Sequence, residues 1–270
     1  MGWRARLSDL FSAGPSGFDG TTGRPPSGNG ASSFHLFWQH EHGGARRWVA
    51  AEATIEVLEP PSVSDLYFWA MQVNFHDGRR GTGGGHIGPQ WISIHPGGTA
   101  INWGGYGADG QELEGSVSSL PSRAGNVNTR DFVWEPRRPY RLRVSYGGPA
   151  PVPGRSSWRG EVIDLTTGDV VHIRDLYAPG DRLDSGMVWS EVFAPCDAPS
   201  VAVRWSDLAL IDDAGARVPI TAASVNYQSR ADGGCATTNI TVDLSGENPG
   251  FLQRSGTTRS TGQGTILHVP

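Results

Sequence analysis

The segments LYFWAMQVNFH (residues 66–76) and HIGPQWISIH (residues 86–95) decide the fold class, because apolar and polar residues alternate along them. Successive side chains of a β-strand point to opposite faces of the sheet. In the first segment the odd-numbered positions from Tyr67 to Phe75 are all apolar or aromatic, whereas the even-numbered positions are polar from Gln72 onward. This pattern predicts a strand with one buried face and a second face that becomes polar toward its end.

A nine-residue stretch, DGRRGTGGG, lies between the two segments and predicts that they form a hairpin centred on it. The cross-strand pairs expected on the polar face are His76 with His86, Asn74 with Gly88 and Gln72 with Gln90. The opposite face would pair Phe75 with Ile87 and Met71 with Trp91, as a buried side requires. A slip of one residue would exchange the two faces, so the register is a hypothesis.

Short runs of the same kind recur along the chain with turn residues between them, and no helical pattern separates them. The whole chain from residue 34 onward is therefore predicted to be all-β, as an antiparallel sandwich or barrel. Residues 1–33, by contrast, are rich in Gly, Ser, Pro and Thr after residue 12, and we expect a flexible leader there. The predicted domains are this leader, 1–33, and a single β-sandwich domain, 34–270.

Composition excludes several classes of function. All 22 basic residues are arginine, which removes the chemistry of phosphate-loop NTPases, protein kinases and Schiff-base enzymes, because each needs a lysine. A net charge of −5 with scattered arginines argues against nucleic-acid binding. No stretch of 18 apolar residues is present, so no membrane span is expected. The predicted partner is a carbohydrate or another hydroxyl-rich ligand.

The two cysteines, Cys196 and Cys235, bear on localisation. The start of the sequence lacks the apolar run of a secretion signal, which predicts a cytoplasmic protein. A disulfide between the cysteines would argue for an oxidising compartment and secretion, whereas free buried thiols would fit a reducing cytosol. The sequence leaves both alternatives open.

The polar face of the predicted hairpin is the first candidate site. Its amide and imidazole side chains offer paired hydrogen-bond donors and acceptors, and nearby aromatic rings could stack on the apolar side of a sugar. Charged residues, which are usual on a solvated sheet face, are missing from it. The alternative is an ordinary solvent-facing surface. The residues expected to bind a ligand here are Gln72, Asn74, Gln90, Trp103 and Tyr106, with His76 and His86 beside them.

A second element, MVWSEVF (residues 187–193), places Trp189 and Glu191 on one strand face. A carboxyl group beside an indole is a combination found in sugar sites, and Glu191 could act as an acid if burial raised its pKa. Glycoside hydrolysis normally needs two carboxylates, and no second one with matching strand geometry is evident. An exposed strand glutamate is the alternative interpretation.

No metal site is predicted, since no cluster with the spacing of metal ligands occurs. His40 and His42 could share a face, but they have no third ligand nearby. Asp212-Asp213 is most simply a turn between strands, although it leaves calcium as a cofactor to be tested.

The segments around residues 66–95 and VWSEVFAPCDAPSVAVRWSDL (residues 188–208) resemble the concanavalin A-like jelly-roll sandwiches. Within them the chain is similar to bacterial domains with a Gly-aromatic-x-Gly-x-Gln strand, here Gly85 to Gln90 with His86 in place of the aromatic residue. The resemblance covers residues 34–211. It implies a two-sheet jelly-roll sandwich with a concave face, a shape used by lectins, glucanases and polysaccharide lyases. The Glu-x-Asp-x-Glu signature of glucanases and the metal loop of lectins are absent.

Three hypotheses about function follow. The first is a carbohydrate-binding domain that recognises a glycan on a concave polar and aromatic sheet face. The second is a polysaccharide lyase or glycoside hydrolase on the same scaffold, with His76 or His86 as base and Glu191 as acid. The third is a small-molecule enzyme or an assembly domain that binds a protein partner.

Overall fold

The computed structural model describes residues 17–40, 46–245 and 249–270 of the chain. These residues form an all-β structure, as the sequence predicts, and its one helical element is the 3-10 turn η2 (Pro96–Gly98). The strands are β1 (Ser32–Gln39), β2 (Trp48–Glu59), β3 (Tyr67–His76), β4 (Gly81–Trp91), β5 (Thr99–Gly107), β6 (Thr129–Asp131), β7 (Tyr140–Pro149), β8 (Ser156–Asp164), β9 (Val170–Ala178), β10 (Arg182–Val192), β11 (Val201–Asp212), β12 (Arg217–Pro219), β13 (Ala222–Tyr227), β14 (Thr238–Asp243), β15 (Gly250–Ser255) and β16 (Ile266–His268).

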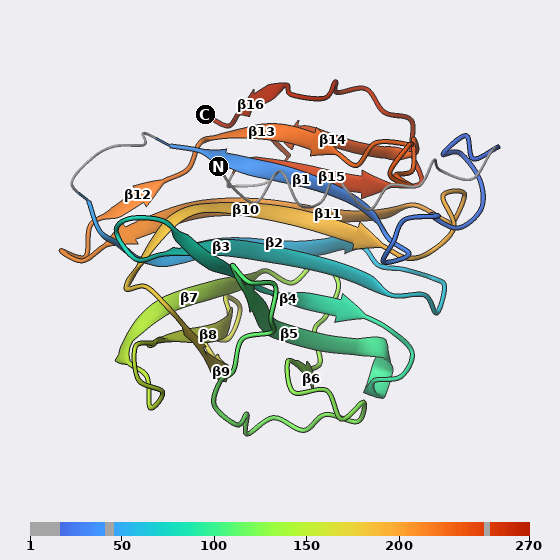
Figure 1. The fold of residues 1–270 in the computed structure, drawn as a ribbon. Helices are drawn as coiled ribbons and strands as arrows, with labels where there is room; N and C mark the ends of the chain where they lie inside the picture. Colours follow the sequence, from blue (N-terminus) through green and yellow to red (C-terminus); the bar gives the residue numbers. More distant parts are fainter. Residues whose placement is uncertain (1–16, 41–45, 246–248) are drawn as a thin grey trace.

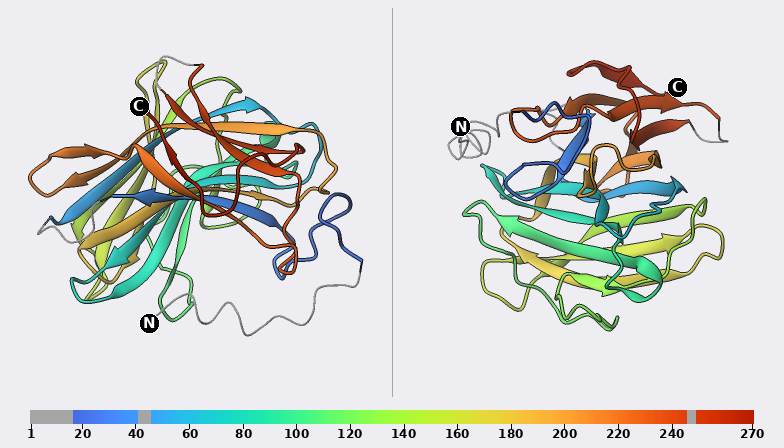
Figure 2. Two further views of the ribbon diagram at one scale, coloured as in Figure 1. Left: turned by 90° about the horizontal axis from the view of Figure 1, so that it is seen from above. Right: turned by 90° about the vertical axis from the view of Figure 1, so that its right-hand side faces the viewer.

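The strands are antiparallel and form the two layers of a β-sandwich. One layer has the order β16-β13-β1-β10-β3-β4-β5-β6, and the other has the order β14-β15-β11-β2-β7-β8-β9, with β12 beside the end of β11. Both orders can be followed from the top to the bottom of Figure 1, and Figure 2 shows the molecule from two further sides. A single register position, Leu183 with Trp48, joins the layers through backbone pairing.

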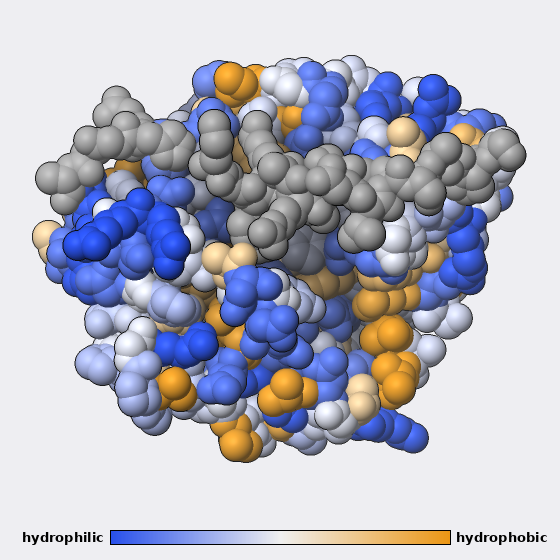
Figure 3. Space-filling view, viewed as in Figure 1, coloured by the Kyte–Doolittle hydropathy of each residue, from blue (hydrophilic) through white to orange (hydrophobic). Residues whose placement is uncertain are grey.

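The core lies between the layers and is rich in aromatic side chains. Phe75 of β3 packs against Trp158 of β8 with ring centroids 5.2 Å apart. The side-chain amide of Gln253 on β15 ties the layers together, because its oxygen accepts hydrogen bonds from Ser190 of β10 and Trp205 of β11, each 2.8 Å long. On the molecular face seen in Figure 3, hydrophobic residues lie in small groups among hydrophilic ones. Because large aromatic side chains fill the space between the sheets, burial of their apolar surface is the main stabilising force.

The hairpin of β3 and β4 has a different register from the predicted one. Gln72 pairs with His86, Met71 with Ile87 and Phe68 with Gln90, a shift of four residues. The predicted register is wrong because the turn is tighter than the loop that was expected: the Asp77 carboxylate accepts the backbone N–H groups of Arg79 and Arg80, each at 2.8 Å. Since four is an even number, every side chain keeps its predicted face.

Gly81 and Gly83–Gly85 of the expected loop lie in strand β4 instead, where Gly88 follows them. A Cβ atom on Gly85 would lie 2.6 Å from the ring of Trp103, and one on Gly88 would lie 1.8 Å from the carbonyl oxygen of Trp69. Only glycine lets β4 approach β3 and the core tryptophan this closely.

The predicted leader, residues 1–33, is described only from residue 17. Residues 17–31 contact the sandwich: the Gly23 carbonyl accepts the Cys196 N–H at 2.8 Å, and Arg24 pairs with Asp65 at 2.7 Å. Strand β1 begins at Ser32, two residues before the predicted boundary. Cys196 and Cys235 form a disulfide beside this segment.

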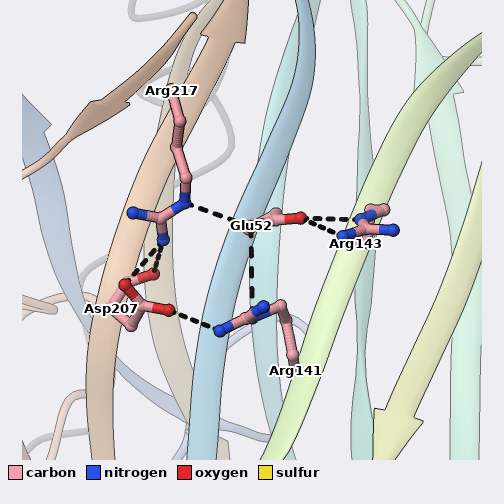
Figure 4. Close-up of polar contacts among 5 residues, drawn as sticks. All are labelled: Glu52, Arg141, Arg143, Asp207 and Arg217. Carbon is pink, nitrogen blue, oxygen red and sulfur yellow. Dashed lines mark hydrogen bonds and ion pairs between the residues drawn. The ribbon is translucent and has the colours of Figure 1, made fainter. Parts of the chain in front are cut away.

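The outer face of the second layer carries a network of charged residues (Figure 4). Glu52 of β2, whose side chain is only 6% exposed, accepts Arg143 at 2.6 Å and Arg217 at 3.3 Å. Arg141 and Arg217 also reach Asp207, each at 2.6 Å. Asp207 has a positive φ of 52° at an irregularity of β11, where its pairing with β2 shifts register. The network holds four neighbouring strands, β12, β11, β2 and β7, together.

Candidate functional site

The predicted site face is the outer face of β1, β10, β3 and β4, here called the amide face. Backbone register places the side chains of this face in rows across the strands. Ser33, Glu191, Phe68 and Gln90 form one row, and Phe37, Met187, Gln72 and His86 form another. His35, Trp189 and Ala70 lie between these rows. The structure thus brings Gln72, Gln90, His86, Trp189 and Glu191 together on one face.

A small hydrophobic cluster lies at the centre of the amide face, separate from the sandwich core. Its members are Phe68, Ala70 and Trp189, with Met187 packed against them. Phe68 and Trp189 are 5% and 6% exposed, and their rings meet edge to face with centroids 4.8 Å apart. This outer face is therefore not an ordinary solvated surface, because its middle is nearly shielded from water.

A chain of polar side chains runs along one side of this cluster. The indole N–H of Trp189 donates to Gln72 Oε1 at 3.2 Å, Gln72 Nε2 donates to Asn74 Oδ1 at 3.3 Å, and Asn74 Nδ2 donates to Ser185 Oγ at 2.8 Å. Each amide uses one donor in this chain, and each amide nitrogen carries a second N–H. The chain fixes the orientation of both amides and leaves them able to bind a further group.

Two imidazole rings lie against the aromatic side chains of this face. The ring of His86 lies 5.7 Å from Phe68, 5.9 Å from Trp189 and 6.2 Å from Tyr106. The ring of His35 lies 6.5 Å from Trp189, and its Nδ1 is 3.3 Å from the amide of Asn226. Burial lowers the pKa of both histidines to about 4, since the charged form would lose its hydration. Both rings are uncharged at neutral pH.

Glu191 is the carboxyl group of the amide face. Its Oε1 accepts hydrogen bonds from Asn29 Nδ2 at 3.2 Å and Ser33 Oγ at 3.4 Å. Burial raises the pKa of Glu191, and these two hydrogen bonds oppose the rise. Among the described residues, no hydrogen bond engages Oε2. Shifted pKa values of this kind cluster at functional sites, so Glu191, His35 and His86 mark this face as a candidate.

Two of the predicted site residues do not join the others. Trp103 is 0% exposed and lies in the core, so its predicted position on the polar face is wrong: it alternates with Asn102 and Gly104 on β5 and faces inward. His76 pairs with Gly81 rather than His86, and its Nδ1 accepts the Gly78 N–H of the turn at 2.9 Å. Tyr106, 48% exposed, lies at the edge of the amide face beside His86.

Sequence reasoning missed His35, Phe68 and Asn29, which complete the amide face. The alternation in FHLFWQ places His35 opposite the buried Phe34 and Leu36 and could have indicated a polar face. No local signal places β1 beside β10 or Asn29 beside Glu191, since 162 residues separate the latter pair. Such contacts depend on strand order.

The structure also bears on metal sites and membrane spans. In the described part of the chain, no group of three His, Cys, Asp or Glu side chains is arranged to hold a metal ion. Asp212 Oδ1 accepts the backbone N–H groups of Ala214 and Ala216, at 3.1 Å and 2.8 Å, so it closes a turn. His42 lies outside the described residues.

The described residues contain no helix with the length and apolarity that a membrane crossing requires.

Comparisons with known proteins find distant structural likenesses and no family. No model of a known protein family matches the sequence, and no curated protein matches it. Among solved structures, the chain is similar to scytalido-glutamic peptidase bound to a peptide-based transition state analogue (12% identity, 82% of this chain and 97% of that one, TM-score 0.45) and to SCP-B, a member of the eqolisin family of peptidases bound to the tripeptide Ala-Ile-His (12% identity, 83% and 96%, TM-score 0.41). It is also similar to the PL-14 alginate lyase from Aplysia kurodai (5% identity, 65% and 87%, TM-score 0.27).

These likenesses are too distant to transfer an activity. The finer resemblance to the concanavalin A-like sandwiches stays a prediction. What the structure itself establishes is the fold class, an all-β antiparallel sandwich.

Proposed function

We propose that this protein binds a carbohydrate on the amide face. The observation that carries the proposal is the hydrogen-bonded chain from Trp189 through Gln72 and Asn74, which runs beside a shielded aromatic cluster. Sugars present hydroxyl groups at their edges and apolar C–H groups on their ring faces. Preoriented amides match the former, and the exposed ring of Tyr106 at the edge of the face matches the latter.

Gln90 and Tyr106 extend this surface. Among the described residues, no hydrogen bond engages the Gln90 side-chain amide, although it is only 8% exposed and lies in the row of Phe68. Its amide oxygen and nitrogen can therefore accept from and donate to a hydroxyl group of a ligand. The ring of Tyr106 is exposed beside His86 and can stack on a sugar ring that extends past the edge of the cluster.

Retention of the purified protein on immobilised neutral and acidic polysaccharides tests the proposal. We expect selective retention on at least one polymer and at least a tenfold loss of affinity in a Trp189→Ala variant, since the substitution removes both the ring and the donor to Gln72. The matched control is His268→Gln, an exposed substitution on β16. Unchanged retention of the Trp189→Ala variant would show that sugars bind elsewhere, and no retention on any polymer would refute the proposal.

A second candidate function, acid–base catalysis on the same bound glycan, is favoured by Glu191. Its pKa is raised, its Oε2 has no hydrogen-bond partner among the described residues, and the uncharged His86 lies on the same face. A protonated Glu191 could donate a proton to a leaving oxygen while His86 accepts one. Catalysis then requires a pH above about 4, where His86 is neutral, and below the raised pKa of Glu191.

The expected activity therefore falls as pH drops toward the pKa of about 4 of His86, and it falls again as pH rises through the raised pKa of Glu191. Release of reducing ends indicates a hydrolase, and ultraviolet absorbance of an unsaturated product indicates a lyase. A Glu191→Gln variant should retain binding and lose turnover at least a hundredfold. Turnover that is equal in this variant would exclude Glu191 as the acid.

We propose that the protein works in an oxidising compartment, because the Cys196–Cys235 disulfide is buried within the fold. Thiol titration of protein isolated from its native source tests this, and two free thiols would contradict it.

A further inference from the structure

We infer that the glycan bound at the amide face is uncharged, and that polymers carrying carboxylate or sulfate groups are excluded. The inference rests on the proposed function and names its ligand class. It follows from the charged side chains of the described residues: the carboxyl group of Glu191 lies on this face, whereas two arginines lie at its ends.

The centre of the amide face offers an anion no cationic partner among the described residues. Its hydrogen-bonding groups are the amides of Gln72, Asn74 and Gln90 and the indole N–H of Trp189. Recognition of carboxylate or sulfate groups in proteins normally uses arginine or lysine, whose charge offsets the loss of hydration. Neutral amides can donate hydrogen bonds to an anion, but they carry no positive charge to offset its loss of hydration.

Two arginines of the described residues flank this face at the ends of strand β10, and both are already paired. Arg182 is its first residue and contacts Asp181 at 3.1 Å. Arg24 donates to the carbonyl oxygen of Phe193, which follows the strand, and pairs with Asp65 at 2.7 Å. Using either arginine for a ligand anion would break an existing ion pair.

Glu191 adds a group that repels anions. It lies opposite Phe68, in the row that ends at Gln90. An anionic sugar placed over this row would bring two carboxyl groups together in a water-poor setting, where one of them must take up a proton. The two imidazole rings do not offset this, since both are uncharged at neutral pH.

The test compares neutral and anionic forms of the same polymer backbone at pH 7, so that chain shape is held constant. Suitable pairs are hydroxyethylcellulose with carboxymethylcellulose, and methyl-esterified with free polygalacturonate, and alginate is added as a polymer of uronates alone. For the backbone that binds, we expect at least tenfold weaker affinity for the anionic form. Equal or tighter binding of the anionic form, or retention on alginate alone, overturns the inference while leaving carbohydrate binding intact. Absence of retention on every polymer overturns the proposed function and the inference together.

A Tyr106→Arg variant gives an independent check. Tyr106 is half exposed at the edge of the face, so arginine fits there without disturbing the core. We expect the preference for the neutral form to fall by about tenfold, because the new cation can pair with a ligand anion. A Tyr106→Gln variant is the uncharged control, and an equal change in both variants would contradict the role of charge.

Discussion

At the scale of single residues, burial sets the properties of the amide face. An exposed imidazole ring has a pKa of about 6.5. Around His35 and His86, aromatic neighbours on β10, β3 and β5 exclude the water that would stabilise the charged form. The same loss of hydration raises the pKa of Glu191, because the charged form of a carboxyl group is the deprotonated one. The sequence identified His86 and Glu191 as candidates, but it could not show their pKa shifts, since these depend on which strands are neighbours.

The two histidines predict how stability changes with pH. Their pKa values are about 4 in the folded protein and near 6.5 when exposed, so the unfolded chain binds more protons between these values. The free energy of unfolding should therefore fall as pH drops from about 6.5 to about 4. Urea unfolding at several pH values measures this. A His35→Gln, His86→Gln double variant should show a flatter dependence.

Glu191 acts in the opposite sense over part of this range. Its raised pKa lets the folded protein keep a proton that the unfolded chain has released, so its burial disfavours folding as pH rises. Comparing the double variant with the wild type at each pH cancels this contribution. An identical pH dependence in the two proteins would show that the imidazoles are hydrated.

At the scale of strands, alternation predicted faces well and register poorly. The even-numbered residues of β3 face outward as expected, whereas the pairing with β4 is shifted by four residues. The sequence GTGGG is typical of a loop because glycine is common in turns, but Gly83 and Gly85 are needed where β4 closely approaches the backbone of β5 and the ring of Trp103. Trp103 was placed on the wrong face for a related reason: it follows a turn whose length the sequence does not reveal.

Gly88 provides a test of this close approach. A Gly88→Ala substitution would place a methyl group against the Trp69 backbone and should destabilise the fold by at least about 3 kcal/mol. The control is Gly81→Ala at the exposed start of β4, where the nearest atom would be 3.9 Å away and a cost below about 1 kcal/mol is expected. Chemical denaturation measures both. Similar stabilities of the two variants would contradict the packing of β4 against β3.

The Glu52 network makes a second prediction at this scale. Glu52→Gln leaves Arg141, Arg143 and Arg217 with Asp207 as their remaining acid in the network. We expect a loss of about 2 kcal/mol, less than for a fully buried pair because the arginines are partly exposed. Glu135→Gln at an exposed ion pair should cost less than about 0.5 kcal/mol. Equal losses in thermal denaturation would show that burial does not strengthen the network.

At the scale of the whole molecule, the two layers and the disulfide region define one structure. The segment 20–31 is held beside the disulfide by backbone bonds from Cys196 to Gly23 and from Ala236 to Gly20. Asn29 of this segment reaches Glu191, so the disulfide region supports the edge of the amide face. The all-β class was predictable from the alternation, but the order of the strands was not, because distant segments pair.

Removing the disulfide should destabilise the protein and loosen this edge. The two cysteines are 39 residues apart, and a loop of that length corresponds to about 4 kcal/mol in the chain-entropy account. A Cys196→Ser, Cys235→Ser variant should therefore unfold at markedly lower urea concentration than the oxidised wild type. Equal midpoints would indicate that the disulfide adds no stability.

The most direct test of carbohydrate binding at the amide face is a calorimetric titration of the polysaccharide that retains the wild-type protein. Wild type, Gln72→Ala and the control Gln111→Ala are compared, since Gln72 connects Trp189 to Asn74 and Gln111 lies exposed in a loop. We predict at least tenfold weaker binding for Gln72→Ala and unchanged binding for Gln111→Ala. Equal affinity of all three proteins would contradict binding at this face.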